Sequence, residues 1–245
     1  MEDGTIKTSM LTFENIISNE EVVLLRGCIA SLVRGWPDDN AQSLAGKSVL
    51  FHNHKRDALR YSYPLIQYKR MQGCAAVVGI NEGAEALVRL AATADSLPCR
   101  LGQRSVVLKA KSFVAAEQRI SLLDRDARQS YRINRWLPLN SDNYRRYQHT
   151  DSIAARVTML ERILTGNILS MAKCVGVFFE GRVRCTLTGM RPSEQTCYKG
   201  VELMAFSADF GCNVDLPENI GLGKAASVGY GTITKRQNHG HDRQD

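Results

Sequence analysis

The order of strand-like and helix-like segments is the feature that most constrains the fold of this chain. In the first half, segments with apolar residues at every second position alternate with segments of helical spacing. Strands are expected at residues 5–14, 47–54, 63–71, 74–81 and 104–115, and helices at 20–36 and 83–94. With one of the middle strands left open, this order is β-α-β-β-α-β, which is the order of the ferredoxin-like fold.

The second half is a looser repeat of the same order. Strands are expected at residues 129–139 and 200–210, and the longest helix at 151–174. This helix would begin after Asp151 or Ser152 as its N-cap. A hairpin turning at Glu180 and Gly181 is expected after it.

The sequence therefore predicts an α+β protein. We expect two tandem ferredoxin-like (RRM-like) domains, each with an antiparallel sheet and helices on one face. The N-terminal domain is placed at residues 1–125 and the C-terminal domain at 126–235. Residues 236–245 are polar and are expected to form a disordered tail.

The seven cysteines contain no CxxC pair, and most lie in apolar stretches. They are interpreted as reduced thiols of a cytoplasmic protein, with no structural zinc site. No apolar run reaches the ~18 residues of a membrane span. The acidic N-terminus lacks the apolar core of a secretory signal. We expect a cytoplasmic protein that has no membrane partner.

The net charge of +7 is concentrated in residues 100–146, which contain eleven Lys or Arg and four Asp or Glu. Aromatic residues are interleaved with the arginines at the end of this segment. Arginine neutralises phosphate and aromatic rings stack on bases, so the pattern suits single-stranded nucleic acid. The RNA-binding candidates are Arg132, Arg135, Arg145 and Arg146. The alternative is a solvated basic face.

Two of the five histidines, His52 and His54, lie two residues apart. If residues 48–54 are extended, both side chains point to one face, about 6.6 Å apart. Such a pair can bracket one phosphodiester of RNA. One imidazole would accept the proton of the 2′-hydroxyl and the other would donate a proton to the leaving 5′-oxygen. This scheme requires no metal and no other cofactor.

Other residues of the same stretch could assist that chemistry. Tyr61 could position the phosphate or a histidine. Neutralisation of phosphate charge is assigned to Lys55, Arg56 and Arg60. The alternatives are a polar strand edge without catalytic function, or a metal site, for which no third ligand follows at suitable spacing. The consecutive letters HNH do not match the nuclease motif of that name, whose three residues lie far apart.

A glycine-rich segment, "GLGKAASVGYG", lies close to the C-terminus. Its candidate RNA-binding residues are Gly221, Gly223, Lys224, Gly229 and Gly231. Glycines let a backbone approach a ligand closely and expose its N–H groups. A phosphate-binding P-loop is excluded because Ala225 follows the lysine, and a dinucleotide site because too few residues follow. The alternative is a glycine-rich turn before a last strand.

These features together resemble a known family. The pattern GxGxxxxxGxG of the glycine-rich segment resembles the loop of the repeat-associated (RAMP) CRISPR proteins, which consist of ferredoxin-like domains. The stretches "FHNHKRDALRYSYPLIQYK" and "GCAAVVGINEGAEAL" resemble the N-terminal part of CRISPR repeat-RNA endoribonucleases of the subtype I-B kind. "LTGNILSMAKCVG" is similar to the long helix of their C-terminal part. The resemblance extends from about residue 25 to residue 233.

The resemblance implies metal-independent cleavage of CRISPR precursor RNA within its repeats, leaving a 2′,3′-cyclic phosphate and a 5′-hydroxyl. It implies that His52, His54 and Tyr61 are catalytic. We expect Lys224 to bind an RNA phosphate. The implied partners are CRISPR repeat RNA and other CRISPR effector subunits, and the implied state is a monomer or a homodimer. Two alternatives stay open: a non-catalytic RNA-binding subunit of a CRISPR complex, and a metal-dependent nuclease.

Overall fold

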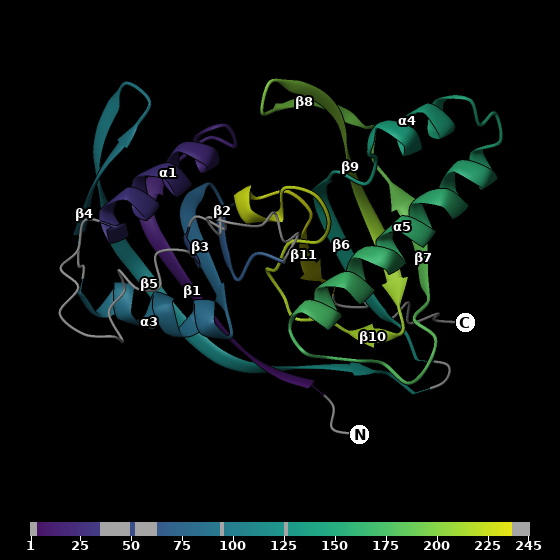
Figure 1. The fold of residues 1–245 in the computed structure, drawn as a ribbon, viewed down its shortest axis with the longest axis horizontal. Coiled ribbons are helices and arrows are strands. Elements are labelled where there is room, and N and C mark those ends of the chain that lie inside the picture. Colours follow the sequence, from purple (N-terminus) through teal and green to yellow (C-terminus); the bar gives the residue numbers. More distant parts are fainter. Residues whose placement is uncertain (1–3, 35–49, 52–62, 94–95, 125–126, 237–245) are drawn as a thin grey trace, which may run out of the picture.

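The computed structural model describes residues 4–34, 50–51, 63–93, 96–124 and 127–236, which form two α+β halves (Figure 1). The helices are α1 (Glu21–Arg34), α3 (Glu82–Thr93), α4 (Ser141–Gln148), α5 (Ile153–Cys174) and the 3₁₀ turn η1 (Ala226–Val228). The strands are β1 (Gly4–Ile16), β2 (Ile66–Met71), β3 (Cys74–Ile80), β4 (Ser96–Leu101), β5 (Arg104–Leu122), β6 (Gln129–Trp136), β7 (Cys185–Met190), β8 (Glu194–Tyr198), β9 (Val201–Cys212), β10 (Val214–Asp215) and β11 (Thr232–Lys235). Within these described ranges, no helix is long and apolar enough to cross a membrane.

The first sheet has β1 at its centre. β1 pairs antiparallel with β5 on one side and with β3 on the other, and β2 follows β3 in the order β5-β1-β3-β2. Leu11 and Phe13 of β1 are buried together with Leu25 and Ile29 of α1, so the helix covers one face of the sheet. The carbonyl of Ala84 in α3 accepts a hydrogen bond from β1 on that same face. The ferredoxin-like prediction is confirmed for this half.

The second sheet repeats this order as β11-β6-β9-β7, with β8 paired to β9. The long helix α5 packs on it through Leu160, Leu164 and Ile168, which are fully buried. Between β9 and β11, where a ferredoxin-like fold has its second helix, the chain instead contains β10, the glycine-rich segment and η1. The α+β prediction of two tandem ferredoxin-like sheets is confirmed, with one helix replaced by this segment.

The two halves are packed against each other through two apolar clusters. The first cluster contains α1 and also Val228 and Tyr230 from the second half. The second contains α5 and also Ile80 and Ile120 from the first half. In addition, β10 of the second half pairs with the end of β5, joining Val214 to Leu122. The interface therefore combines apolar burial with strand pairing.

Two expected segments differ from the structure. Leu50 and Phe51 are helical, so the strand at residues 47–54 is wrong at the two positions that the structure describes. Phe51 is buried in the first cluster beside α1. The hairpin at Glu180 and Gly181 is also wrong, because residues 175–184 contain no strand. Val177 and Val183 bury their side chains in the second cluster from this irregular connection.

The expectation of seven reduced cysteines is wrong for one pair. Cys28 of α1 and Cys99 of β4 are paired as a disulfide, with their Cα atoms 5.7 Å apart, a separation that disulfides adopt. Their positions, 71 residues apart in the chain, gave no sequence signal for the pairing. Cys185 and Cys212 are buried free thiols, whereas Cys174 and Cys197 are exposed.

The sequence predictions contain no counterpart of β4, α4 and β8, nor of the short elements β10 and η1. Pro98 lies inside β4, and proline is tolerated there because β4 pairs only with β5 at the edge of the sheet. Helix α4 has no buried residue and therefore no apolar stripe. Its start is fixed instead by Asn140, whose side chain accepts a hydrogen bond from the Asn143 N–H at 2.8 Å.

Replacing Leu164 by Ala tests the packing of α5. Leu164 is fully buried in the second cluster, so the variant should lose about 2–5 kcal/mol of unfolding free energy. Urea denaturation measures this loss. The matched control is Ile153→Ala on the same helix, because Ile153 is 78% exposed and its removal should cost less than about 0.5 kcal/mol. Equal losses in the two variants would contradict the assigned face.

Candidate functional site

The histidine stretch lies mostly outside the described residues. This applies to His52, His54, Lys55, Arg56, Arg60 and Tyr61. The structure does describe the two flanks of the stretch. On one side, the Phe51 carbonyl accepts a hydrogen bond from the Tyr68 hydroxyl at 3.4 Å. On the other side, Tyr63 leads into β2 and contacts the second half of the chain. The premise of an extended strand through residues 48–54 does not hold at Leu50 and Phe51, so the same-face argument for the histidines loses its support.

Tyr63 connects that stretch to the glycine-rich segment. Its hydroxyl donates a hydrogen bond to the Gly221 carbonyl at 2.7 Å. Burial raises the pKa of Tyr63 above its ordinary value, so the hydroxyl keeps its proton and remains a donor at neutral pH. The Gly221 N–H donates in turn to Oε1 of the buried Gln67 at 2.8 Å. Both backbone groups of Gly221 are thus bound by side chains of the first half.

The glycine-rich segment is a closed loop between the two halves, drawn in yellow in Figure 1. Gly221 and Thr232 form an antiparallel bridge at its base, and the Leu222 N–H donates to the Gly231 carbonyl at 2.8 Å. Gly231 has φ of 64° and its Cα faces the Leu222 carbonyl, so no side chain fits there. The exposed residue of the loop is Lys224. The loop therefore exposes one positive side chain, Lys224, while the backbone at its two ends is buried.

Gly223 is required by internal packing. A Cβ at this position would lie 2.8 Å from Oδ1 of Asn167 and 3.0 Å from Nε1 of Trp136. These two side chains are hydrogen-bonded to each other at 2.9 Å, with the indole N–H donating. Asn167, in the middle of α5, thus has a specific partner there. The expectation that glycines admit a ligand is replaced at Gly223 by a close approach of the loop to α5.

Lys69 of β2 is buried at the foot of this loop. It is 1% exposed, and its Nζ donates to Oγ1 of Thr232 at 2.9 Å. The Thr232 hydroxyl donates to the Gly229 carbonyl at 3.3 Å. Burial alone lowers the pKa of Lys69 to about 7. An amine at this position is thus held near the point where it loses its charge at neutral pH.

Arg132 and Arg135 have partners inside the protein. Arg132 makes a two-pronged ion pair with Asp209, at 2.8 and 3.2 Å. Arg236, at the start of the expected tail, joins the same carboxylate at 2.7 Å. The hydrogen bond from Arg132 is the main cause that lowers the pKa of Asp209. The Arg135 guanidinium lies 4.7 Å from the centre of the Tyr230 ring, a cation–π geometry.

Arg145 and Arg146 are exposed on α4. They are close to its C-terminal end, where positive side chains complement the helix dipole. The structure therefore separates the four arginines of the sequence prediction into two sets. Arg132 and Arg135 are held at β6, whereas Arg145 and Arg146 are free of an ion pair in the described part of the chain.

An aromatic group at the β8–β9 hairpin was missed by the sequence analysis. Tyr198 and Tyr230 meet edge to face, with ring centroids 6.0 Å apart, and Nζ of Lys199 lies 5.7 Å from the Tyr198 ring. Lys199 and Gly200 both have positive φ, as a two-residue hairpin turn requires. The sequence Tyr198-Lys199-Gly200 before an alternating strand could have indicated this hairpin turn.

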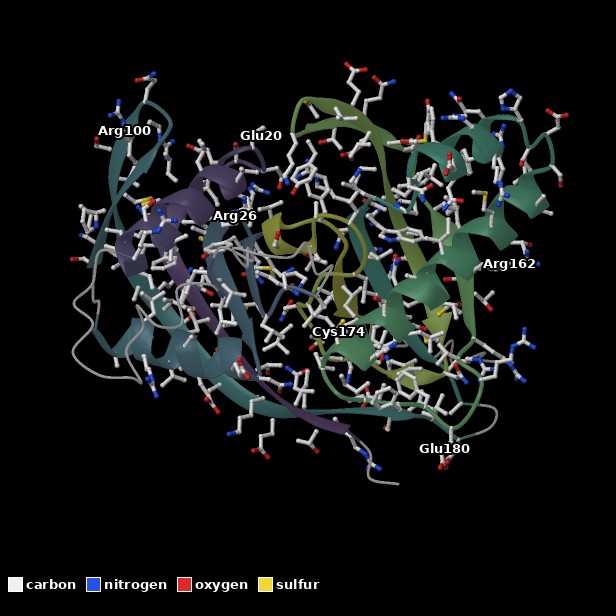
Figure 2. All side chains as sticks on the ribbon, viewed as in Figure 1. Glu20, Arg26, Arg100, Arg162, Cys174 and Glu180 are labelled. Atoms are coloured by element: carbon white, nitrogen blue, oxygen red, sulfur yellow. A yellow bond between two sulfur atoms is a disulfide. The ribbon has the colours of Figure 1, made fainter. Side chains whose placement is uncertain are left out.

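This group faces the N-terminal end of α1. Figure 2 shows Glu20 at that end, on the side of α1 next to the β8–β9 hairpin. A hydrogen bond with Ser18 is the main cause that lowers the pKa of Glu20, and the charges of Arg135 and Arg70 add to it. The aromatic pair, the arginines and the loop thus line one side of the junction between the halves.

Comparisons with known proteins match both halves. A family model for the Cas6b N-terminal domain matches residues 4–119, and one for the Cas6b C-terminal domain matches residues 124–236. An uncharacterized protein of Methanocaldococcus jannaschii is 32% identical over 103 residues, which are 42% of this chain and 69% of that protein.

Solved structures share the fold. A crystal structure of Cas6b has a TM-score of 0.78 at 22% identity, with 95% of this chain and 100% of the other covered. A crystal structure of the CRISPR RNA processing endoribonuclease Cas6b has a TM-score of 0.66 at 21% identity, with the same coverage. At these identities the likeness establishes the fold.

The buried amine of Lys69 predicts a pH-dependent contribution to stability. The folded protein releases the Lys69 proton near pH 7, whereas the unfolded chain keeps it up to about pH 10.4. The unfolded state binds more protons in this window, so rising pH should stabilise the folded state. The difference in unfolding free energy between wild type and Lys69→Met should therefore shift in favour of wild type between pH 7 and pH 9. Urea denaturation at both pH values measures it, and a constant difference would contradict the assignment.

Proposed function

This chain belongs to the Cas6b family, and we propose on that premise that it is an endoribonuclease that cuts CRISPR precursor RNA within its repeats. Membership makes the chain a homologue of CRISPR RNA-processing endoribonucleases. The match of both halves to the family models is the observation that carries the proposal. The histidine stretch and the basic, glycine-rich surface supply residue types that such a reaction needs.

The proposed reaction is a transesterification that uses the nucleophile of RNA itself. One of His52 and His54 accepts the proton of the 2′-hydroxyl while the 2′-oxygen forms a bond to phosphorus. The bond from phosphorus to the 5′-oxygen breaks, and the other histidine protonates that oxygen. The products are a 2′,3′-cyclic phosphate and a 5′-hydroxyl, and no metal takes part. Tyr61 is assigned to the phosphate or to orienting a histidine.

The proposed RNA surface combines the glycine-rich loop with the basic side chains. Lys224, Arg145 and Arg146 are exposed, which supports direct contacts with phosphate. Arg135 is half-buried over the buried ring of Tyr230, so only the outer side of its guanidinium would be offered to RNA. Arg132 is engaged by Asp209, so we assign it to holding β6 and β9 together beneath that surface. Lys55, Arg56 and Arg60 remain proposed phosphate contacts next to the histidines.

Replacing both His52 and His54 by Ala should lower the cleavage rate by about 1,000-fold or more, because general acid and base are lost together. RNA affinity should stay within a few-fold of wild type. The measurement is single-turnover cleavage of labelled CRISPR repeat RNA from the source genome in excess EDTA. His149→Ala is the matched control, since His149 is an exposed histidine at the end of α4. It should cut at the wild-type rate.

The same assay separates the proposed reaction from its alternatives. A substrate with a single 2′-deoxy nucleotide at the cut site should not be cut, because the nucleophile is missing. Cleavage of that substrate, or loss of all cleavage in EDTA, would favour a metal-dependent nuclease. Tight binding with no cut under any condition would favour a non-catalytic RNA-binding subunit.

Replacing Arg145 and Arg146 by Ala should weaken RNA binding and reduce its salt dependence. Each lost phosphate contact should reduce the slope of log affinity against log salt by about 0.7. Binding titrations at several salt concentrations measure the slope. Arg162→Ala is the control, because Arg162 is exposed on α5 (Figure 2) and is not assigned to the surface. An unchanged slope in the double variant would identify the α4 arginines as a solvated face.

A further inference from the structure

Three side chains from residues 63–69 hold the base of the glycine-rich loop. The Tyr63 hydroxyl donates a hydrogen bond to the Gly221 carbonyl at 2.7 Å, and the Gln67 amide oxygen accepts one from the Gly221 N–H at 2.8 Å. The Lys69 amine donates a hydrogen bond to the Thr232 hydroxyl oxygen at 2.9 Å. Because Gly221 and Thr232 are bridged to each other, these contacts grip both ends of the loop. We call Tyr63, Gln67 and Lys69 the clamp.

The clamp is directional. Gln67 is fully buried and its amide nitrogen donates to the Pro64 carbonyl at 3.1 Å, which fixes the orientation of the amide that Gly221 meets. Gly229 has positive φ and packs 3.5 Å from the Tyr68 carbonyl, measured from where its Cβ would be. Packing alone would be served by apolar side chains, since burying an amide and an amine is costly without hydrogen bonds. What these polar groups add is a defined orientation of the loop.

The clamp also follows directly on the histidine stretch. Two residues of chain span at most about 7 Å, so Tyr61 is covalently tethered to Tyr63 at short range. The loop carries Lys224 as its exposed cation. One short segment of chain thus joins the proposed catalytic residues to the loop that is proposed to hold RNA.

We propose that Tyr63, Gln67 and Lys69 are positioning residues for RNA cleavage, which set the glycine-rich loop in register with His52, His54 and Tyr61. This inference rests on the proposed function. The clamp touches no reacting atom. Its effect is to bring a phosphate held at Lys224 to the catalytic stretch in one geometry, and a misplacement of about 1 Å can cost about 100-fold in rate.

The test uses Tyr63→Phe, Gln67→Met and Lys69→Met in the full chain. Each keeps most of the side-chain volume and removes the polar contact. Single-turnover cleavage at saturating protein should fall by about 10- to 100-fold, with RNA affinity within about threefold. Hydrogen exchange of the 219–232 backbone should accelerate, because its anchors are lost. Thr232→Val should behave like Lys69→Met, and Thr232→Ser, which keeps the acceptor oxygen, should recover most of the rate.

Tyr131→Phe is the matched control for a purely structural effect. The Tyr131 hydroxyl is buried and donates to the Val214 carbonyl at 3.0 Å, away from the clamp. This variant should lower the melting temperature as the clamp variants do and leave the cleavage rate unchanged. Wild-type rates in the clamp variants, or rate losses that only follow melting temperature in all variants, would overturn the clamp while the proposed function stands. A wild type that does not cut would overturn the proposed function and the clamp with it.

Discussion

The hydrogen bonds at Gly221 set how the two halves of this protein meet. The apolar clusters supply most of the attraction between the halves, but the hydrophobic effect has no direction, and a purely apolar junction could slide. Tyr63 and Gln67 bind the carbonyl and the N–H of one residue, which allows a single relative position. The hydrogen bond from the buried Lys69 to Thr232 of the second half depends on that position.

Much of the fold could be predicted from periodicity. β1 and α5 were found because one face of each is buried, so their apolar residues recur with the period of the element. β3 was found as a short continuous apolar run, because both of its faces are buried. Helix α4 was missed because it buries no residue, and β4 because Pro98 argues against a strand. The connection at residues 175–184 was mistaken for a hairpin, since Val177 and Val183 bury apolar side chains without forming a strand.

The site was predicted less completely, for a tertiary reason. The glycines identified the loop, yet nothing in the strand expected at residues 63–71 indicated that its polar residues Gln67 and Lys69 are partners of that loop. Both are buried because the second half covers their face of β2, which no local pattern records. The role of Gly223 could not be assigned either, because Trp136 and Asn167 approach it from 87 and 56 residues away in the chain. The disulfide of Cys28 and Cys99 has the same long-range origin.

The strand β5 is shared by both halves: β1 and β4 pair with most of its length, and β10 pairs with its last two residues. This continuous strand of 19 residues limits rotation of the two halves, because turning one half away from the other would break the pairing of Val214 with Leu122. The pairing of β5 with both halves therefore fixes the distance between them. Under the proposed function, an RNA that contacts both halves must fit this fixed spacing, so the width and curvature of the RNA would affect binding before any base is read.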